Sequence, residues 1–534
     1  MNKTVTLCLL LTVAIALALR CPQPGARPMH SDEAVNTIKF RELWEHGYYK
    51  YDPAEFHGPT LPYFTLAWAK LTGAPRNFAQ FDEAIFRTVT VLFGIGLILF
   101  LPLIADGLGP RAALCAALLT AVSPAMVFYS RYYIHEMLLT FFTFLALAAG
   151  WRYTRSGSEP LKPAAGWGER TREPKLAWAV VTGAALGFMQ ATKETFLFAV
   201  VAAAIAMALN EFWMRRIDAT AVPAPLKFKL SHLAAGALAG LAVAITLFSS
   251  FFSNRAGLLD SFRTYLPWTH RVEGASPHIH PWNFYFARLI FYHTARGQIW
   301  SEGLILILAI VGIVAVFRHK LPAHANANFV RFIALYTVVL TAIYCAIPYK
   351  TPWCLLSFWH GMILLAGVGA MTLIERASSR GRRVAFAALL LIGAGQLSLE
   401  AWQASVLRPT KPGNPYAYSQ TSPNVLELAA QMEALSRANP LGHQMVIKVM
   451  APEAAYWPLP WYLRDFTNIG WYSQIPPDPY ASVMIVSKNF DANLDANKTH
   501  IMSEIYALRP DSFFELYVET NLWNNYLRTR PPEP

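Results

Sequence analysis

Long runs of apolar residues recur along most of the chain, and they constrain its fold more than any other feature. The first run, TVTLCLLLTVAIALAL, stands near the start, and the others follow at short intervals as far as residue 402. A run of about 17 residues or more is long enough to cross the hydrocarbon core of a bilayer as an α-helix. Alternating period-two strands do not dominate, so the sequence predicts a polytopic helical membrane protein rather than a β-barrel.

We expect about eleven membrane-spanning helices within residues 1–402. A chain in which 54% of 534 residues are hydrophobic has more apolar surface than a soluble protein of this length buries. The first segment is either a retained helix or a signal peptide; we favour the helix, and both alternatives place Asp32 outside the cytoplasm. The segments lie near 4–20, 88–105, 110–128, 137–151, 176–191, 195–213, 231–252, 299–317, 329–347, 353–374 and 384–402.

Lysine and arginine gather in alternate loops, which predicts the orientation of the chain. The loops 152–175, 214–230, 318–320 and 375–383 are basic, as is typical of cytoplasmic loops. This asymmetry explains the net charge of +12 without a nucleic-acid partner. The same pattern places the segment after residue 402 outside the cytoplasm, and cations on that side could meet anionic lipid head groups.

Two parts of the chain are predicted to lie outside the membrane core. The outer loops 21–87 and 253–298 of the transmembrane domain are long and aromatic, and we expect helices along the membrane surface in them. Residues 403–534 change in composition and predict a small extracytoplasmic α/β domain, with strands near 445–450, 482–487 and 513–519 and a helix at 424–437; a parallel sheet is the arrangement we consider. No glycine-rich phosphate loop accompanies the strands. The five cysteines give no framework from which to assign a disulfide.

Isolated ionisable residues gather at the outer ends of the predicted helices. Such residues are costly inside a bilayer, so their depth is informative. A transporter would place charges or broken helices near the midplane, whereas this pattern predicts a site at the outer surface. The candidate residues are Asp32 and Glu33 in HSDEA, His57 in HGP, Arg131, His135 and Glu136 in SRYYIHEM, Lys193 in TKET and Lys350 in PYKTPW.

These residue types fit a reaction on a lipid phosphate. Cations neutralise a phosphate leaving group, and a carboxylate takes a proton from an attacking hydroxyl. The sequence HE at 135–136 lacks the second histidine of a zinc HExxH motif. Aromatic residues in the outer loops and a membrane groove would hold a sugar and a polyprenyl tail.

Each candidate also has a structural alternative. Two carboxylates after Ser31 are typical of the first turn of a surface helix. An arginine beside a glutamate suits a structural ion pair, and a lysine at a helix end can reach the lipid head groups. In WPLPWYLRDF (457–466), a packed core segment competes with a sugar-stacking platform. These alternatives concern Asp32 with Glu33, Arg131 with Glu136, Lys193, His57, Lys350, Trp457, Trp461 and Tyr462.

The order of these strings resembles the GT-C superfamily, the membrane-embedded glycosyltransferases that use polyprenyl-phosphate sugars. That superfamily includes protein mannosyltransferases and the lipid A aminoarabinose transferase. SDEA resembles its acidic motif after the first helix, and SRYYIHEMLLTFF resembles its second acidic position. A narrower resemblance is to the bacterial and archaeal family named as flippase-activity-associated, on HSDEA, YDPxxxHGP, SRYYIHEM, TKET, PYKTPW, QTSPNV and WPLPWYLRD.

The resemblance implies a GT-C-like fold in a bacterial or archaeal cytoplasmic membrane. It also implies an inverting transfer of a sugar from a polyprenyl-phosphate donor to a lipid, glycan or protein acceptor. Asp32 would match the catalytic base, with Glu33 beside it, and Glu136 would position the acceptor. A divalent metal such as Mg or Mn is left open, with Asp32 and Glu136 as its ligands if one is used. The candidates for binding lipid phosphate or sugar are His57, Arg131, His135, Lys193 and Lys350.

Two other functions stay open at this level. A non-catalytic accessory to lipid-linked sugar flipping would share the lipid groove but would need no base. An ion-coupled transporter is disfavoured by the placement of the charges. In either case the C-terminal domain could bind the acceptor or a partner protein.

Overall fold

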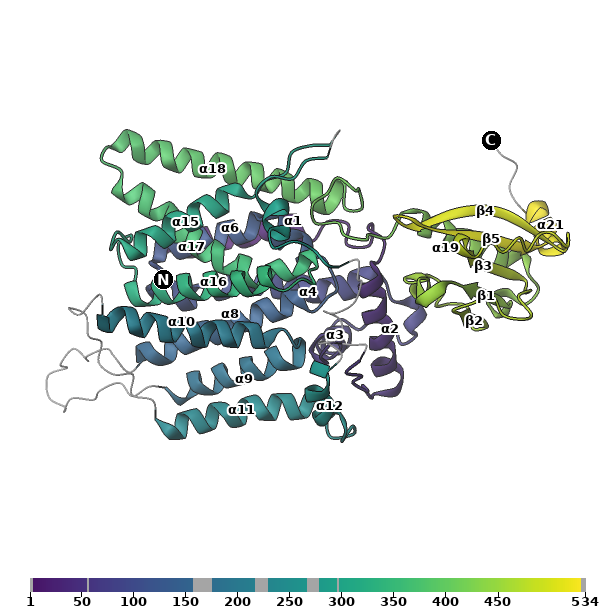
Figure 1. Ribbon diagram of the computed structural model, residues 1–534, viewed down its shortest axis with the longest axis horizontal. Coiled ribbons are helices and arrows are strands. Elements are labelled where there is room, and N and C mark those ends of the chain that lie inside the picture. The colour runs from purple at the N-terminus through teal and green to yellow at the C-terminus, as the bar shows by residue number, and fades with distance from the viewer. Residues whose placement is uncertain are drawn as a thin grey trace.

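A bundle of long helices and a separate five-stranded sheet make up the molecule (Figure 1). The computed structural model describes residues 3–54, 57–156, 175–216, 229–266, 278–294 and 297–529. The bundle helices run along the longest axis, whereas α2 (Ser31–His46) crosses between the bundle and the sheet (Figure 1). The predicted architecture, a polytopic helical membrane protein with a small C-terminal α/β domain, is confirmed.

All of the predicted apolar segments fold as helices, since lipid offers no other partner for backbone polar groups. Among the described residues, eight helices are long and apolar enough to cross a membrane, and the pair α6 (Pro110–Val122) and α7 (Pro124–Ser130), bent by 59°, makes a ninth. Two shorter apolar helices are α9 (Leu176–Thr192) and α15 (Gly303–Phe317). The expected number of crossings therefore stays a prediction. The other bundle helices are α1 (Lys3–Arg20), α4 (Glu83–Phe100), α8 (Glu136–Ser156), α10 (Phe196–Arg216), α11 (Leu230–Phe248), α16 (Ala327–Ala346), α17 (Leu356–Arg376) and α18 (Arg380–Trp402).

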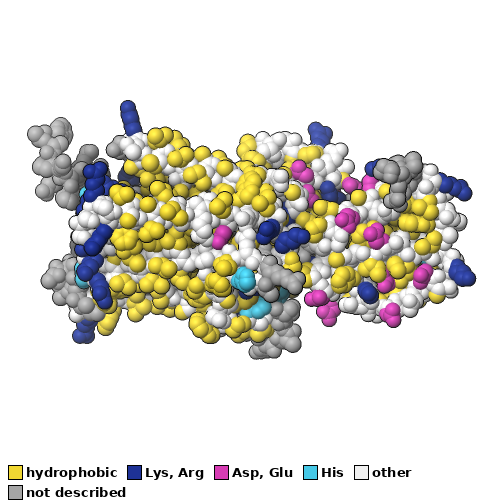
Figure 2. Space-filling view, turned by 90° about the horizontal axis from the view of Figure 1, so that it is seen from above, with side chains coloured by type: hydrophobic (Ala, Val, Ile, Leu, Met, Phe, Trp, Pro, Cys, Tyr) yellow, Lys and Arg dark blue, Asp and Glu magenta, His cyan; other side chains and the backbone are white. Residues whose placement is uncertain are grey.

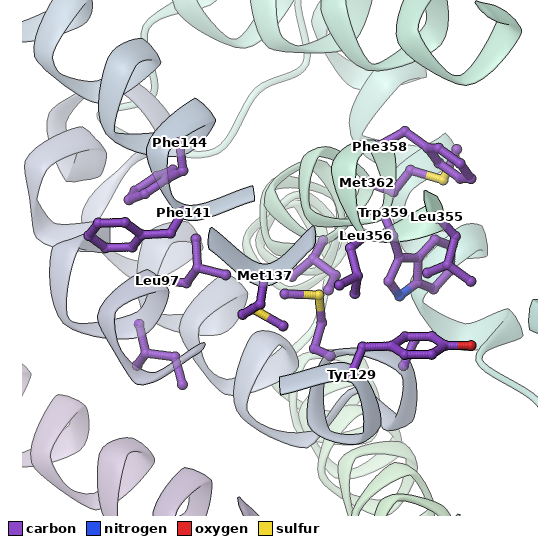
Figure 3. Close-up of a cluster of buried hydrophobic side chains, with 14 of the residues drawn as sticks. Leu97, Tyr129, Met137, Phe141, Phe144, Leu355, Leu356, Phe358, Trp359 and Met362 are labelled. Atoms are coloured by element: carbon purple, nitrogen blue, oxygen red, sulfur yellow. The ribbon is translucent and has the colours of Figure 1, made fainter. Parts of the chain in front are cut away.

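Helix α17 forms the centre of the bundle. In the most apolar 18-residue stretch of the span that contains α17, 89% of the residues are buried, whereas the same measure is 17% for α10 and for α11. In Figure 3, Trp359 and Leu356 of α17 lie beside Met137 of α8 and Tyr129 of α7. The face of the bundle seen in Figure 2 is also largely hydrophobic, as a surface in contact with lipid must be.

Both outer loops contain short helices, as predicted. They are α2, α3 (Thr60–Leu71), α12 (Gly257–Arg263) and α14 (Phe284–Leu289). In Figure 1, α2, α3 and α12 lie at the end of the bundle that faces the sheet. The strings HSDEA and HGP, which directly precede or begin α2 and α3, therefore lie at this end.

The C-terminal domain is built on a mixed sheet of order β2-β1-β3-β5-β4. Strand β1 (Ile447–Met450) is parallel to β2 (Ile469–Tyr472) and β3 (Val483–Ser487), whereas β5 (Ser512–Glu519) is antiparallel to β3 and β4 (His500–Arg509). Three strands and the helix α19 (Asn424–Ala438) match the expected positions. The parallel arrangement that we considered holds for β2, β1 and β3 only, because β4 and β5 form an antiparallel hairpin that pairs with β3 through β5. A second helix, α21 (Thr520–Thr529), packs beside α19.

Lysine and arginine side chains gather at the end of the bundle away from the C-terminal domain (Figure 2). They extend from the ends of α10 and α15 and from the first turns of α6 and α18. Exposed members of this basic end are Arg111, Arg215, Arg216, Arg318, Lys320, Arg380, Arg382 and Arg383.

Candidate active site

The first turn of α2 contains the two adjacent carboxylates, and His30 caps it. The Asp32 amide donates to His30 Nδ1 at 3.1 Å, and the His30 amide donates to Glu33 Oε2 at 2.9 Å, which completes a capping box. Because Nδ1 accepts a hydrogen bond, the ring proton of the neutral imidazole is on Nε2. The Tyr418 carbonyl lies 3.1 Å from Nε2 and accepts a hydrogen bond from it. Burial also lowers the pKa of His30. His30 is therefore neutral, and its 3.9 Å approach to the Asp32 carboxylate is not an ion pair.

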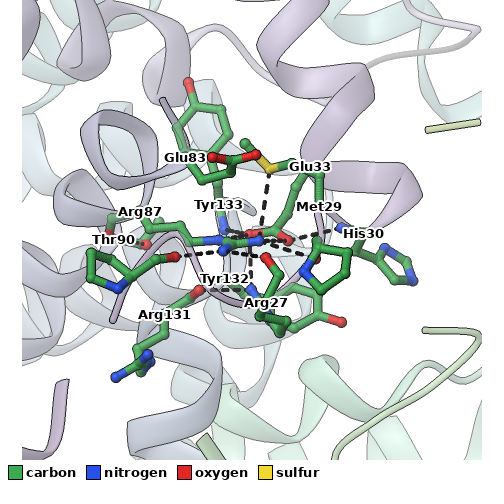
Figure 4. A network of polar contacts seen from close by, with 12 residues as sticks. Arg27, Met29, His30, Glu33, Glu83, Arg87, Thr90, Arg131, Tyr132 and Tyr133 are labelled. Carbon is green, nitrogen blue, oxygen red and sulfur yellow. Dashed lines mark hydrogen bonds and ion pairs between the residues drawn. The ribbon is translucent and has the colours of Figure 1, made fainter. Parts of the chain in front are cut away.

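Glu33 is fully buried in a network of cationic and backbone donors (Figure 4). Arg87 of α4 binds it through both carboxylate oxygens at 2.8 Å, and Arg27 binds Oε1 at 3.0 Å. The Tyr133 amide donates to Oε1 at 2.9 Å. Burial alone would raise the pKa of Glu33, but the two guanidinium groups lower it to about 2. This carboxylate joins α2 to α4 and to the loop before α8, and it does not line the cavity described next.

Asp32 lies on the wall of a cavity of about 230 Å³. Its side chain is 49% exposed, and among the described residues no lysine or arginine nitrogen lies within 4 Å of its carboxylate. The cavity brings together residues from both outer loops and from three helix junctions. Its lining is Asp32, Val35, Asn36, Pro53, Ala54, His57, Ile134, His135, Glu136, Glu194, Thr264, Tyr349 and Trp353.

Two further carboxylates line this cavity, and each has a basic side chain as its partner. Glu136, at the start of α8, forms an ion pair with Lys193, and both side chains are nearly buried. Glu194 lies 2.9 Å from His57 Nδ1. Burial lowers the pKa of Lys193, but the Glu136 carboxylate outweighs it and raises that pKa. Burial raises the pKa of Glu194, but His57 lowers it to about 2.

The break between α9 and α10 supplies both pairs from consecutive residues. Lys193 and Glu194 turn to different partners there, and the HGP loop docks against the same break. Gly58 donates its amide to the Thr192 carbonyl at 3.1 Å, and a Cβ at Gly58 would lie 2.1 Å from the Ala191 oxygen. Only glycine permits this approach, which holds His57 beside Glu194.

His135 is a buried neutral imidazole at the cavity wall. Its Nε2 lies 3.0 Å from the Gly58 carbonyl and must donate to it, which leaves Nδ1 as an acceptor. That Nδ1 is buried and has no hydrogen-bond partner. Burial lowers the pKa of His135 well below its usual range, and the neighbouring His57 and Lys193 add to the effect. The geometry therefore leaves one histidine lone pair without a hydrogen-bond donor.

The predicted site residues separate into two groups. Asp32, His57, His135 and Glu136 share the cavity, and Lys193 reaches it through Glu136. Arg131 donates instead to the carbonyls of Arg20 and Gln23 at 3.2 and 3.3 Å, and so it forms no ion pair with Glu136. The Lys350 ammonium donates to the carbonyls of Ile347 and His280. Neither Arg131 nor Lys350 lines the cavity.

Sequence reasoning missed Glu194 and the structural use of His30. The signal for Glu194 was its position beside Lys193 in TKET, since adjacent residues at a helix break can serve opposite sides of a cavity. The outer loop 253–298 also contains four histidines, at positions 270, 278, 280 and 293. His278 and His280 both contact the Tyr418 hydroxyl, at 2.8 and 2.9 Å. His270 lies outside the described residues.

The sequence leaves a divalent metal open, with Asp32 and Glu136 as its ligands. The described part of the chain has no cluster of three or more His, Cys, Asp or Glu side chains placed to hold one. Glu136, one of the two ligands that we considered, already has the Lys193 ammonium as its counter-charge. We therefore derive no step through a metal.

Solved structures share the architecture that this site is built on. ArnT from Cupriavidus metallidurans bound to undecaprenyl phosphate aligns with a TM-score of 0.62 and 15% identity, over 96% of this chain and 98% of that chain. The archaeal oligosaccharyltransferase AglB from Archaeoglobus fulgidus, in complex with an inhibitory peptide and a dolichol-phosphate, aligns with a TM-score of 0.58 and 12% identity, over 92% of this chain and 70% of that chain. The chain therefore shares the fold of these solved structures.

A family model, a further solved structure and the curated protein sequences were also compared with the chain. A family model described as dolichyl-phosphate-mannose-protein mannosyltransferase matches residues 61–259, a segment that includes Glu136 and Lys193 but begins after Asp32. An AglB structure with Zn and sulfate aligns with a TM-score of 0.52 and 13% identity, over 96% of this chain and 73% of that chain. No curated protein sequence matches the chain.

Proposed function

We propose that this protein transfers a sugar from a polyprenyl-phosphate donor to an acceptor hydroxyl at the outer face of the cytoplasmic membrane. The GT-C fold and the family match support glycosyl transfer from a lipid-linked donor, because ArnT and AglB are bound to polyprenyl phosphates. The cavity at the outer end of the bundle is the site that we assign to this reaction.

One observation carries the assignment of the base. Of the three carboxylates on the cavity wall, Glu136 is paired with the Lys193 ammonium and Glu194 with the His57 imidazole, whereas among the described residues no lysine or arginine nitrogen lies within 4 Å of the Asp32 carboxylate. A carboxylate already paired with a cation is a weak proton acceptor, whereas an unpaired carboxylate can take a proton from an attacking hydroxyl. Different environments thus give neighbouring carboxylates different roles.

The proposed reaction is a single displacement. The acceptor oxygen attacks the anomeric carbon as Asp32 takes its proton, the bond to the lipid phosphate oxygen breaks, and the configuration at that carbon inverts. His57 on the cavity wall and Lys193 behind Glu136 are the candidates to stabilise the leaving phosphate, and each would have to exchange its carboxylate partner for it. Arg131 and Lys350 would first have to give up their carbonyl partners.

Asp32→Asn tests the proposal in proteoliposomes supplied with a panel of polyprenyl-phosphate sugars. Loss of a general base costs about 10²–10⁴-fold in rate, so release of free polyprenyl phosphate should fall by that factor while the melting temperature stays unchanged. Glu45→Gln is the matched control, because that carboxylate is also on α2 but is paired with Arg41 at the surface. Full turnover by Asp32→Asn would reject the role of Asp32. Donor binding without turnover in the wild-type protein would instead favour the accessory function.

A further inference from the structure

A second cavity adjoins the first on the other side of Asp32. It has a volume of about 640 Å³ and lies between α2 and the C-terminal domain. Asp32 and Val35 line both cavities. The smaller cavity is lined by the outer loops and helix junctions of the bundle, whereas the larger one has Trp457, Asn489 and Arg509 of the C-terminal domain as its opposite wall. We call this larger cavity the interdomain cleft.

The two walls of the interdomain cleft are held together by specific contacts. Ser31 Oγ lies 3.4 Å from both the Trp457 carbonyl and Arg509 Nη1. Arg509 Nη2 donates to the Ala455 carbonyl at 2.9 Å. Burial lowers the pKa of Arg509, and the nearby Asp32 carboxylate opposes that effect. A guanidinium has five N–H donors, so these contacts leave donors that a ligand can use close to Asp32.

The chemistry of the lining matches a carbohydrate. Asp32 and Glu453 offer only acceptors, Arg509 only donors, and Asn489 both, and a sugar hydroxyl donates and accepts at once. The half-buried indole of Trp457 adds a flat apolar surface, which suits the C–H face of a sugar ring. The volume is within the range of about 300–1,000 Å³ that is usual for ligand sites.

The backbone of the cleft wall is also unusual. Glu453 and Ala454 are consecutive non-glycine residues in the left-handed region, with φ of 50° and 56°. Such a conformation is strained for a residue with a side chain, and strained residues are concentrated at functional sites. Both residues belong to the 452–455 segment, which lines the cleft opposite α2.

We propose that the interdomain cleft binds the acceptor and that the acceptor is a carbohydrate, stacked on Trp457 and hydrogen-bonded by Arg509. This inference rests on the proposed transfer reaction, since Asp32 would take the proton from an acceptor hydroxyl that enters from the cleft. The donor would occupy the smaller cavity, and the two substrates would meet at one carboxylate.

Binding without turnover tests the inference. The full chain in nanodiscs is applied to an array of oligosaccharides and, in parallel, to an array of serine- and threonine-containing peptides. We expect retention on oligosaccharides, and both Trp457→Ala and Arg509→Gln should weaken it by about tenfold or more. Trp523→Ala is the matched control, because that indole lies on α21 and does not line the cleft; its binding should stay within about twofold of wild type.

Each other outcome overturns the inference. Retention on peptides alone would make the acceptor a protein, and no retention on either array would deny the cleft a carbohydrate role. Oligosaccharide binding that Trp457→Ala leaves intact would place the carbohydrate elsewhere. Donor consumption is measured separately, as polyprenyl phosphate released by the same variants. A failure of the proposed function would show as carbohydrate binding without any donor consumption, and a failure of this inference as donor consumption without carbohydrate binding.

Discussion

At the scale of single residues, Asp32 and Glu33 show how the turn of one helix separates two neighbouring carboxylates. On a helix, consecutive side chains point about 100° apart, so Glu33 faces Arg87 and Arg27 while Asp32 faces the cavity. The adjacency of the two residues in the sequence could not show which one is buried. That depends on α4 and on the 21–30 segment, which are brought to α2 only in the folded chain.

Glu33→Gln should destabilise the protein, in contrast to Asp32→Asn. The substitution removes the negative charge from between two buried guanidinium groups, and breaking a buried ion pair costs about 3–5 kcal/mol. A fall in melting temperature, measured by intrinsic fluorescence in detergent, would accompany loss of activity in proportion to the unfolded fraction. Equal melting temperatures for Glu33→Gln and Asp32→Asn would contradict the structural role of Glu33.

The same ion pair predicts a dependence of stability on pH. The pKa of Glu33 in the folded protein, about 2, is below the ordinary value of 4.5 for a glutamate side chain. Its stabilisation, about 3 kcal/mol, is therefore complete above pH 4.5 and is lost as the pH falls from 4.5 toward 2. Melting temperatures measured between pH 6 and pH 3 should converge for the wild-type protein and Glu33→Gln, and parallel curves would count against the assigned pKa.

The sequence could indicate the candidates for the cavity but not the roles of all of them. Depth in the membrane was a valid signal for Asp32, His57, His135 and Glu136, because charged residues at outer helix ends must face protein or water. The same signal included Arg131 and Lys350, whose partners are backbone carbonyls at chain turns. No pattern of residue types records such carbonyl partners, and so the two cations could not be set apart in advance.

At the scale of elements, α9 and α11 pack with their backbones in contact, directly before the break that holds Lys193 and Glu194. The backbones touch because Gly183 and Gly187 of α9 face Gly236 and Gly240 of α11. The spacing of four residues in each helix is typical of close packing in membranes, where small residues allow van der Waals contact between backbones. This spacing was visible in the sequence, and it positions the break after α9 that holds Lys193 and Glu194.

Gly183→Ala should therefore disturb the helix pair. A Cβ at this position would lie 1.8 Å from the Gly236 oxygen, so the helices must separate, and overpacking of this kind costs about 1–3 kcal/mol. Gly150→Ala in α8 is the control, because nothing lies within 4 Å of its added Cβ and alanine is the better helix former. We expect a lower melting temperature for Gly183→Ala only. Equal values for the two variants would show that α9 and α11 do not pack as described.

The strands illustrate the limit of pattern reading at this scale. Strands β3 and β5 are largely buried and apolar, and they were predicted. Strand β2 has four half-exposed residues including Gly470, and β4 has register shifts at Met502/Glu504 and Ala507/Arg509. A short edge strand and an interrupted alternation give no clear period of two, so neither was found in the sequence.

At the scale of the whole molecule, the C-terminal domain is fixed to the bundle rather than loosely tethered. Trp461 donates to Glu83 at 2.9 Å, and Arg464 donates to the carbonyls of Phe81 and Ala79 at 2.9 and 3.2 Å. Trp461 is fully buried, so the core interpretation of this segment holds for it, while Trp457 lines the interdomain cleft. A fixed domain keeps the cleft next to Asp32, which a mobile domain would not.

The distribution of charge along the molecule predicts its orientation. The basic end of the bundle is opposite the C-terminal domain (Figure 2), and basic loops stay in the cytoplasm. In a background without the five native cysteines, Asn525→Cys on α21 should react with a membrane-impermeant maleimide in intact spheroplasts. Arg382→Cys at the basic end should react only after lysis, and since both positions are exposed, accessibility across the membrane is the only difference. The reverse labelling pattern would put the Asp32 cavity on the cytoplasmic side of the membrane. A donor would then not need to be flipped before use, and the proposed reaction at the outer face would be rejected.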